Sequence, residues 1–336
     1  MEGHLKITIF SYLDPKYSRT GVFYVWAKEL GVDIKFVKVN SGFKNSISTL
    51  KNNIRSKRDF SETFIVGSPS HLLVWIFRLI SRNKIYLDAG WSLTESTIIR
   101  SKNKMVWLKN YLIDYFAFRV AQIIFVESKE QLKYIKAKFN IPEHKMFVSY
   151  TGFDEISIKN SLRVRPQEIS NLDDFVLVRG KNVKESGLEN ILNLAPFFPH
   201  IHFVFVTNTK PFDLIHPNVT WINRTISNGE LAYLYEHCRL VFGQISDSER
   251  LKRTIPHKCF EALYFEKPYL AIKTPSMLEV FPSDYPFFIN FDENFNVNIM
   301  DKLNSHELQT KAKEYVLKIK NRFSQENLSR EFLSNI

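Results

Sequence analysis

The sequence has few cysteines and no long apolar segment. Only two of its 336 residues are cysteine, Cys238 and Cys259, and each lies in an apolar stretch. Two thiols in such surroundings argue against a disulfide-stapled secreted fold and favour a reducing compartment. No run of about 18 apolar residues is present, so we expect nothing to span a bilayer. The N-terminus has no basic-then-apolar export signal, which predicts a cytoplasmic protein.

Two kinds of binding motif are also missing. The glycine fingerprint G-x-G-x-x-G does not occur, which counts against a nicotinamide or flavin enzyme. No recognised nucleic-acid-binding motif is present, so we expect no nucleic acid among the partners.

Length and charge describe a two-domain protein with a basic first half. A chain of 336 residues fits two domains of about 150 residues each. The net charge is +11, and residues 1–155 hold 24 Lys and Arg against 14 Asp and Glu, whereas the remainder holds 22 against 21. A basic surface of this kind is either simply solvated or attracts an acidic polymer or an anionic membrane surface.

Apolar strands alternate with helices along the whole chain. A strand at 5–10, a polar loop and a helix at 22–30 form a Rossmann-like entry, and the alternation continues, which predicts an α/β fold with parallel sheets. We expect a first domain at 1–155, a polar linker, a second domain at 172–305 and a C-terminal helix within 306–336 that crosses back to the first domain.

The most informative stretch covers residues 250–272. It follows a strand, places several basic residues in a loop, and then begins an apolar helix at Pro256. Basic side chains beside the N-terminus of a helix form an anion site suited to phosphate. Glu261 lies in the middle of this apolar helix, where a carboxylate needs partners or a ligand. The alternative is an ordinary ion pair between Glu261 and Lys258 beside a solvated basic turn.

A second glycine-containing turn follows the strand at 175–179. The strand delivers Arg179 to its C-terminal end, and Lys181, Lys184 and Gly187 come directly after it. Ligands of open α/β sheets bind at this edge, and glycine permits close backbone approach. A surface turn with ordinary charges is the alternative.

The segment RTIPHKCFEALYFEKPYLAI resembles the donor-binding segment of family 4 glycosyltransferases. That family has the GT-B fold, in which two Rossmann-like domains face each other across a cleft. In the family pattern a Glu holds the ribose of the donor nucleotide, which implies that role for Glu261. The usual second Glu, eight positions earlier, is replaced by Arg253, as in variants with I-P-x-K. The residues that the resemblance places near the donor phosphates are Arg253, Thr254, Ile255, Pro256 and Lys258.

The resemblance extends to the turn after the strand at 175–179. In family 4 enzymes an Arg and a Lys of this turn hold the donor diphosphate through forked hydrogen bonds and a point charge. Arg179 matches the Arg, and either Lys181 or Lys184 matches the Lys. The resemblance thus implies catalytic roles for Arg179 and Glu261.

Two features of the first half have open interpretations. Asp88 ends a strand before Gly90, where active-site groups of α/β folds lie, but it can equally bond backbone amides of its own turn. The segment 102–119 is basic at its start and rich in aromatic residues. Such a helix either lies at a membrane interface, at the inner face of the membrane, or packs on its own domain.

Three functions follow from this pattern. The first is a glycosyltransferase that moves a sugar from a nucleotide-diphosphate donor to a glycan or lipid-linked acceptor, in cell-surface polysaccharide or glycoconjugate synthesis. The resemblance implies retention of configuration, and because no D-x-D motif occurs we expect no metal and no cofactor besides the donor substrate. The second is a nucleotide-sugar epimerase on the same fold. The third is a non-catalytic protein that binds anionic glycans or membranes.

Overall fold

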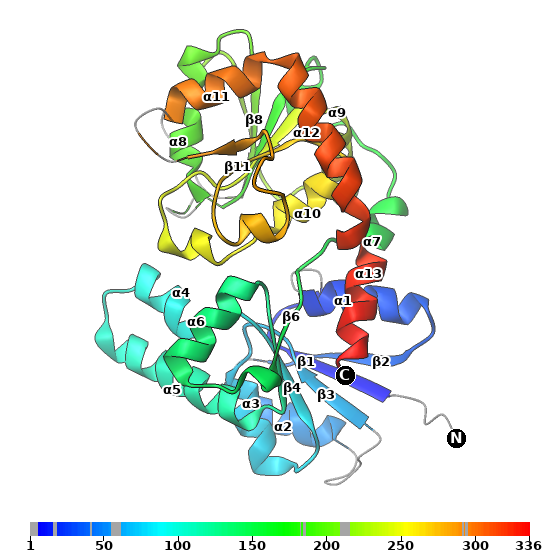
Figure 1. The fold of residues 1–336 in the computed structure, drawn as a ribbon. Coiled ribbons are helices and arrows are strands. Elements are labelled where there is room, and N and C mark those ends of the chain that lie inside the picture. Colours follow the sequence, from blue (N-terminus) through cyan, green and yellow to red (C-terminus); the bar gives the residue numbers. More distant parts are fainter. Residues whose placement is uncertain are drawn as a thin grey trace. The chain divides into compact units, whose positions relative to one another are not determined.

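The computed structural model describes residues 6–15, 19–40, 42–54, 62–181, 183, 186–208, 216–290, 292 and 295–336, without the side chains of 295–297. The chain divides into two compact units. The first unit contains Met1–Thr151 together with Gln325–Ile336, and the second contains Gly152–Ser324. Each unit is an α/β structure with its own sheet (Figure 1).

The first unit is built on a six-stranded sheet in the order β2-β1-β3-β4-β5-β6, and every neighbouring pair is parallel. Its middle strands are buried throughout because helices cover both faces, and this burial explains their largely apolar sequences. The strands are β1 (Lys6–Ser11), β2 (Asp33–Lys38), β3 (Glu62–Val66), β4 (Ile85–Gly90), β5 (Ile123–Val126) and β6 (Met146–Val148).

Seven helices belong to the described part of the first unit. They are α1 (Arg19–Glu29), α2 (Phe43–Asn53), α3 (Leu72–Ile80), α4 (Leu93–Arg100), α5 (Lys104–Val120), α6 (Lys129–Phe139) and α13 (Gln325–Ser334). Helix α13 comes from the C-terminus and packs beside α1 (Figure 1). The ring of Phe332 lies 4.6 Å from that of Phe23, and the side chain of Gln325 donates to the carbonyl oxygen of Val22 at 2.9 Å.

The second unit repeats the plan with a parallel sheet in the order β12-β11-β10-β7-β8-β9. The strands are β7 (Val176–Arg179), β8 (Phe203–Thr207), β9 (Val219–Asn223), β10 (Leu240–Phe242), β11 (Tyr269–Ile272) and β12 (Phe288–Ile289). The helices are α7 (Glu155–Lys159), α8 (Leu188–Leu192), α9 (Asn228–His237), α10 (His257–Tyr264), α11 (Phe295–Asn304) and α12 (His306–Ile319). The predicted α/β class with two doubly wound parallel sheets is confirmed.

Several local expectations differ from the structure. The segment expected to be a polar linker, 155–172, contains helix α7, which packs on α9, so it belongs to the second unit. The C-terminal segment 306–336 is not one helix: α12 is followed by a 3-10 turn, η8 (Lys320–Phe323), and then by α13. Helix α2 has few apolar residues, and only Ser46 and Leu50 of it are buried.

Candidate active site of the second unit

Arg179 stands at the point where the strand order of the second sheet reverses. It is the last residue of β7, whose neighbours are β8, which follows it in sequence, and β10, which does not. The carboxyl ends of strands on either side of such a reversal leave a crevice, where open α/β folds bind ligands. The two turns singled out by the sequence begin at these strand ends, one after β7 and the other after β10.

Glu261 reaches the same place from helix α10. Its carboxylate is only 2% exposed and accepts hydrogen bonds from three side chains. Arg179 and His257 donate to Oε1, the latter with its Nδ1 at 3.0 Å, and the hydroxyl group of Tyr235 on α9 donates to Oε2. The structure therefore joins Arg179 and Glu261 directly. The expected alternative, an ion pair between Glu261 and Lys258, is absent from the contacts of these two described residues.

The cluster of Glu261 with Arg179, Tyr235 and His257 shifts the pKa values of its own members. Burial by itself raises the pKa of Glu261, but the charge of Arg179 and the hydrogen bond from His257 bring it well below its usual value. Burial likewise lowers the pKa of Arg179, and Glu261 more than reverses this effect. Burial, with Glu261 beside it, raises the pKa of Tyr235. The cluster thus presents an ionised carboxylate and a permanently charged guanidinium.

The resemblance places Lys258 near the donor phosphates. In the structure, however, its side chain does not point toward the basic loop. Its side chain is buried, and Nζ donates to the carbonyl oxygen of Arg179 at 3.0 Å and to that of Gly243 at 2.7 Å. Lys258 therefore connects the ends of β7 and β10 and satisfies two backbone carbonyl groups. The predicted contact with the donor phosphates has no support from this orientation.

This position of Lys258 predicts a pH effect on stability. Burial, with repulsion from Arg179, lowers the pKa of Lys258 to about 7, whereas an unfolded Lys titrates near pH 10.4. The unfolded chain binds more protons between these values, so stability rises with pH across that window, by at most about 1.4 kcal/mol per pH unit. A neutral amine still has two N–H donors for the two carbonyl groups.

Denaturant unfolding of the wild type and of Lys258→Met between pH 7 and 10 measures this effect. We expect Lys258→Met to be less stable by about 1–3 kcal/mol, because two buried carbonyl groups lose their donor, and to lack the rise. Equal pH slopes in the two proteins would contradict the buried amine.

The two turns lie against each other at the sheet edge. Gly187 has a φ of +62°, and a Cβ placed on it would lie 1.8 Å from the carbonyl oxygen of Ile245, so only glycine fits there. The Ile245 N–H donates to the carbonyl oxygen of Ser186 at 3.3 Å, and the Asn190 side chain donates to that of Ile245 at 2.8 Å. Residues about 60 positions apart in sequence thus form one connected surface.

The basic loop before α10 is held by a side chain from the segment that follows β11. It begins with a 3-10 turn, η6 (Glu249–Lys252), and continues through Arg253 to Pro256, which caps α10. The hydroxyl group of Ser276 lies 2.9 and 3.1 Å from the carbonyl oxygens of Leu251 and Thr254, and its single proton can be donated to either. Ile255 is buried, so it can meet a ligand only through its backbone. Arg253 and Thr254 remain half-buried at the surface.

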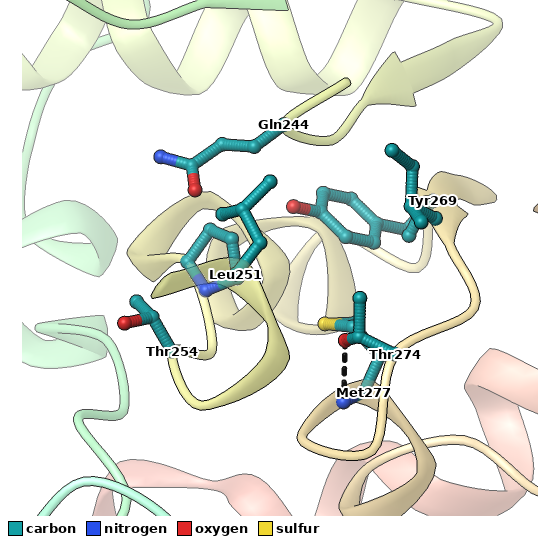
Figure 2. Close-up of a pocket in the computed structure, with 9 residues that line it drawn as sticks. Gln244, Leu251, Thr254, Tyr269, Thr274 and Met277 are labelled. Carbon is teal, nitrogen blue, oxygen red and sulfur yellow. Dashed lines mark hydrogen bonds between the residues drawn. The ribbon is translucent and has the colours of Figure 1, made fainter. Parts of the chain in front are cut away.

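A pocket lies under this loop and was not expected from the sequence (Figure 2). The space in it that a water-sized group can occupy is about 10 Å³, which is room for about one water molecule. Figure 2 shows the hydroxyl group of Tyr269 directed toward Gln244 and Leu251, and this buried oxygen has no hydrogen-bond partner among the described residues. The lining residues are Gln244, Leu251, Thr254, Pro256, Tyr269, Ala271, Ile272, Thr274 and Met277.

Two lysines remain among the predicted ligands of the diphosphate. Lys181 is exposed, in the same turn as Arg179. Lys184 lies outside the described residues. Sequence reasoning missed Tyr235 and His257, the other two partners of Glu261. His257 follows Pro256 and lies one helical turn before Glu261, a spacing that does signal contact. Tyr235 lies on a different helix and carries no comparable signal.

Asp88, in the first unit, is a buried ion-pair partner. It lies within β4, fully buried, and accepts a hydrogen bond from the guanidinium of Arg19 on α1. Arg19 also donates to the backbone carbonyl of Ser149. The expected alternative, bonding to amides of its own turn, is not what Asp88 does. Its burial supports a structural contact, and its predicted catalytic role gains no support.

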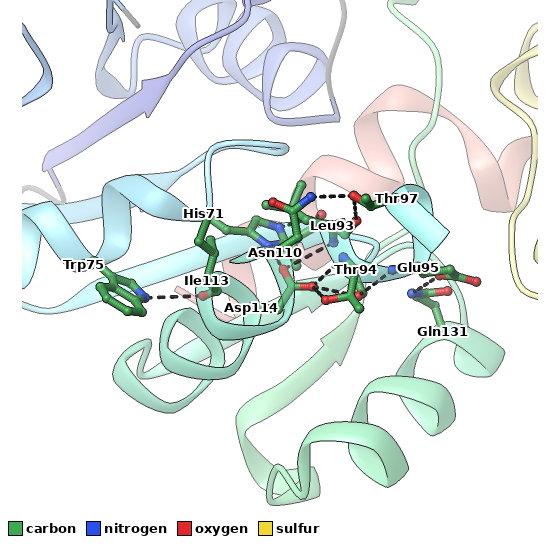
Figure 3. A network of polar contacts seen from close by, with 12 residues as sticks. His71, Trp75, Leu93, Thr94, Glu95, Thr97, Asn110, Ile113, Asp114 and Gln131 are labelled. Atoms are coloured by element: carbon green, nitrogen blue, oxygen red, sulfur yellow. Dashed lines mark hydrogen bonds and ion pairs between the residues drawn. The ribbon is translucent and has the colours of Figure 1, made fainter. Parts of the chain in front are cut away.

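A second acid of the first unit forms the centre of a larger network (Figure 3). Asp114 on α5 is fully buried. Its carboxylate accepts from His71 Nδ1 at 2.7 Å, from the hydroxyl groups of Ser92 and Thr94 at 2.7 Å each, and from the backbone N–H groups of Leu93 and Thr94. It thereby fixes the first turn of α4 and the loop after β4. Sequence reasoning did not single out Asp114.

Comparison with known proteins gives the fold but not a family. No protein-family model and no curated protein matches the sequence. HepE of Anabaena, solved in complex with UDP-glucose, matches with a TM-score of 0.70 at 12% identity, over 98% of this chain and 100% of that chain. The trehalose 6-phosphate synthase of Burkholderia multivorans matches with a TM-score of 0.68 at 8% identity, covering 98% and 96%.

An enzyme of another class matches as well. The UDP-N-acetylglucosamine 2-epimerase of Rickettsia bellii has a TM-score of 0.52 at 11% identity, covering 98% of this chain and 95% of that chain. At such identities the similarity establishes the fold alone. The chain has the GT-B fold, in agreement with the expectation from sequence.

Proposed function

We propose that the chain is a glycosyltransferase that uses a nucleotide-diphosphate sugar, bound by the second unit. The observation that carries this proposal is the direct pairing of Arg179 with Glu261 at the strand-order reversal. A cation suited to a diphosphate and an acid suited to ribose hydroxyl groups thus share one site. The UDP-glucose bound to HepE supports the same class of donor.

The pairing leaves capacity for a ligand. A guanidinium has five N–H donors, and the buried Nε–H of Arg179 has no partner in the described part of the chain. Among the described residues, Oε2 of Glu261 accepts from Tyr235 alone, so one further donor, such as a ribose hydroxyl, can bind it. The half-buried Arg253 and the N-terminus of α10 add positive potential beside them.

In this proposal catalysis is positional and electrostatic. Breaking the bond between sugar and diphosphate leaves negative charge on the diphosphate, and preorganised cations stabilise that charge as it develops. We propose transfer to a glycan or lipid-linked acceptor with retention of configuration and without a metal, in polysaccharide or glycoconjugate synthesis at the cell surface. A cytoplasmic location of the enzyme is part of the same proposal.

A thermal-shift panel of nucleoside diphosphates and their sugars tests donor binding. A ligand present at 100 times its Kd adds about 2.7 kcal/mol of stability. We expect one diphosphate, with UDP as the first probe, to raise the melting temperature, and the matching monophosphate to raise it less. If no nucleoside diphosphate stabilises the protein, the proposal is wrong.

The epimerase of Rickettsia bellii favours one competing function on the same fold. An epimerase interconverts its nucleotide sugar without an acceptor, whereas a transferase releases the nucleotide diphosphate only as sugar is transferred or hydrolysed. Incubation with UDP-N-acetylglucosamine, followed by NMR of the sugar ring, distinguishes them. A new sugar epimer with the nucleotide still attached would assign the chain to the epimerases.

A further inference from the structure

Helices α4 and α5 pack against each other as a hairpin in the first unit (Figure 1). This hairpin carries exposed apolar side chains. The exposure of these side chains ranges from 40% for Ile99 to 72% for Met105. We call the set the apolar stripe. It consists of Ile98, Ile99, Met105, Leu108, Leu112 and Phe116.

The packing of the first unit accounts for only part of this stripe: the ring of Phe116 lies 4.5 Å from that of Trp75 on α3, in an edge-to-face contact. Helix α5 already buries one face, with Ile113, Ala117 and Phe118 in the core. Met105, Leu108, Leu112 and Phe116 follow one another at intervals of three and four residues, which places them together on the opposite face. A surface helix of a globular protein normally has polar residues there. Apolar residues on both faces indicate a second contact outside the unit.

The charges around the stripe are all of one sign. Only two acidic residues occur between 93 and 126, Glu95 and Asp114, and both are buried. The exposed charged residues at the hairpin tip and along α5 are Arg100, Lys102, Lys104, Lys109 and Arg119. The hairpin therefore combines exposed apolar area with exposed positive charge only.

The hairpin is held in this form by its own contacts. The side chain of Asn110 on α5 donates to the hydroxyl group of Thr97 on α4. The indole N–H of Trp107 donates to the carbonyl oxygen of Ser101 at 2.6 Å, which closes the turn between the helices. The stripe is thus presented by a preformed element.

We propose that the apolar stripe docks on the surface of an anionic lipid bilayer. Apolar side chains enter the boundary between headgroups and acyl chains, and the surrounding Lys and Arg bind anionic headgroups. A second copy of the chain fits less well, because a self-paired surface would bring its positive charges together. No helix in the described part of the chain is long and apolar enough to cross a membrane, so the hairpin lies on the bilayer. Docking is independent of the proposed donor site in the second unit.

Co-sedimentation of the full chain with vesicles tests the proposal. We expect binding to vesicles of phosphatidylcholine with phosphatidylglycerol, weak binding to phosphatidylcholine alone, and loss of binding in high salt. The variant Lys104→Gln with Lys109→Gln should weaken binding about 30-fold, since each surface charge contributes about a factor of five. The variant Leu108→Gln with Leu112→Gln should weaken it at least tenfold.

Leu79→Gln is the matched control, because Leu79 is a leucine of the first unit that is 72% exposed outside the stripe. It should bind vesicles like the wild type, and all variants should keep the wild-type melting temperature and nucleotide affinity. Wild-type protein that ignores anionic vesicles, or binding that survives Leu108→Gln with Leu112→Gln, would overturn the proposal. So would a dimer in analytical ultracentrifugation that this double variant abolishes, which would assign the stripe to a second copy.

Discussion

Replacing Arg179 with Met is expected to abolish binding of the nucleotide diphosphate and to destabilise the second unit at the same time. The substitution removes the proposed diphosphate ligand, which should lower kcat/KM at least about 100-fold. It also leaves the buried carboxylate of Glu261 without its guanidinium partner. Breaking a buried ion pair on one side costs about 3 kcal/mol or more. Denaturant unfolding and calorimetric titration with UDP measure the two effects.

The double variant Arg179→Met with Glu261→Gln separates binding from stability. Both charges are gone, so most of the lost stability should return, whereas nucleotide binding should stay absent. Arg224→Met is the matched control, because Arg224 pairs with Glu168 and Glu230 at the surface of the same unit. It should cost about 1 kcal/mol or less and leave binding unchanged. Nucleotide binding at wild-type affinity in the folded double variant would show that the pair does not hold the donor.

Replacing Asp114 with Ala should destabilise the first unit by about 3–5 kcal/mol. The carboxylate is the common acceptor for His71, for the hydroxyl groups of Ser92 and Thr94, and for two backbone N–H groups of α4. Alanine leaves these buried donors unsatisfied. The variant Asp114→Asn should be more stable than Asp114→Ala but less stable than the wild type, since the amide nitrogen of Asn faces groups that are themselves donors.

The pH dependence of unfolding gives an independent check on Asp114. Burial by itself raises the pKa of Asp114, but the hydrogen bond and the charge of His71, with bonds from Thr94, bring it below its usual value. The contribution of ionised Asp114 to stability is therefore complete above the pKa of an unfolded Asp, about 3.9, and is lost in stronger acid. Asp14→Ala, which breaks an exposed pair with Lys38, is the control and should change stability by less than about 1 kcal/mol. If Asp114→Ala changed stability by as little as this control, Asp114 would not be the centre of a stabilising network.

The fold could be predicted because its signals are local. Strands such as β3 and β8 are buried along their length, so they read as short apolar runs bounded by polar or glycine residues. The break between α12 and α13, at the 3-10 turn η8, was not expected, because the sequence predicts a single helix within 306–336.

The site could be predicted in position but not in its contacts. An acid in an apolar helix marks a buried carboxylate, and this signal identified Glu261 but was overlooked for Asp114, which lies between Ile113 and Tyr115. Partners such as Tyr235 come from other elements, and their distance in space depends on packing. The orientation of Lys258 depends on packing in the same way: its side chain turns into the sheet edge, and its contact with the donor phosphates stays a prediction.

A crystal structure of the protein with UDP tests the central claim most directly. The account predicts that the diphosphate contacts the guanidinium of Arg179 and the start of α10, and that a ribose hydroxyl bonds to the carboxylate of Glu261. A nucleotide bound with neither side chain in contact would contradict it.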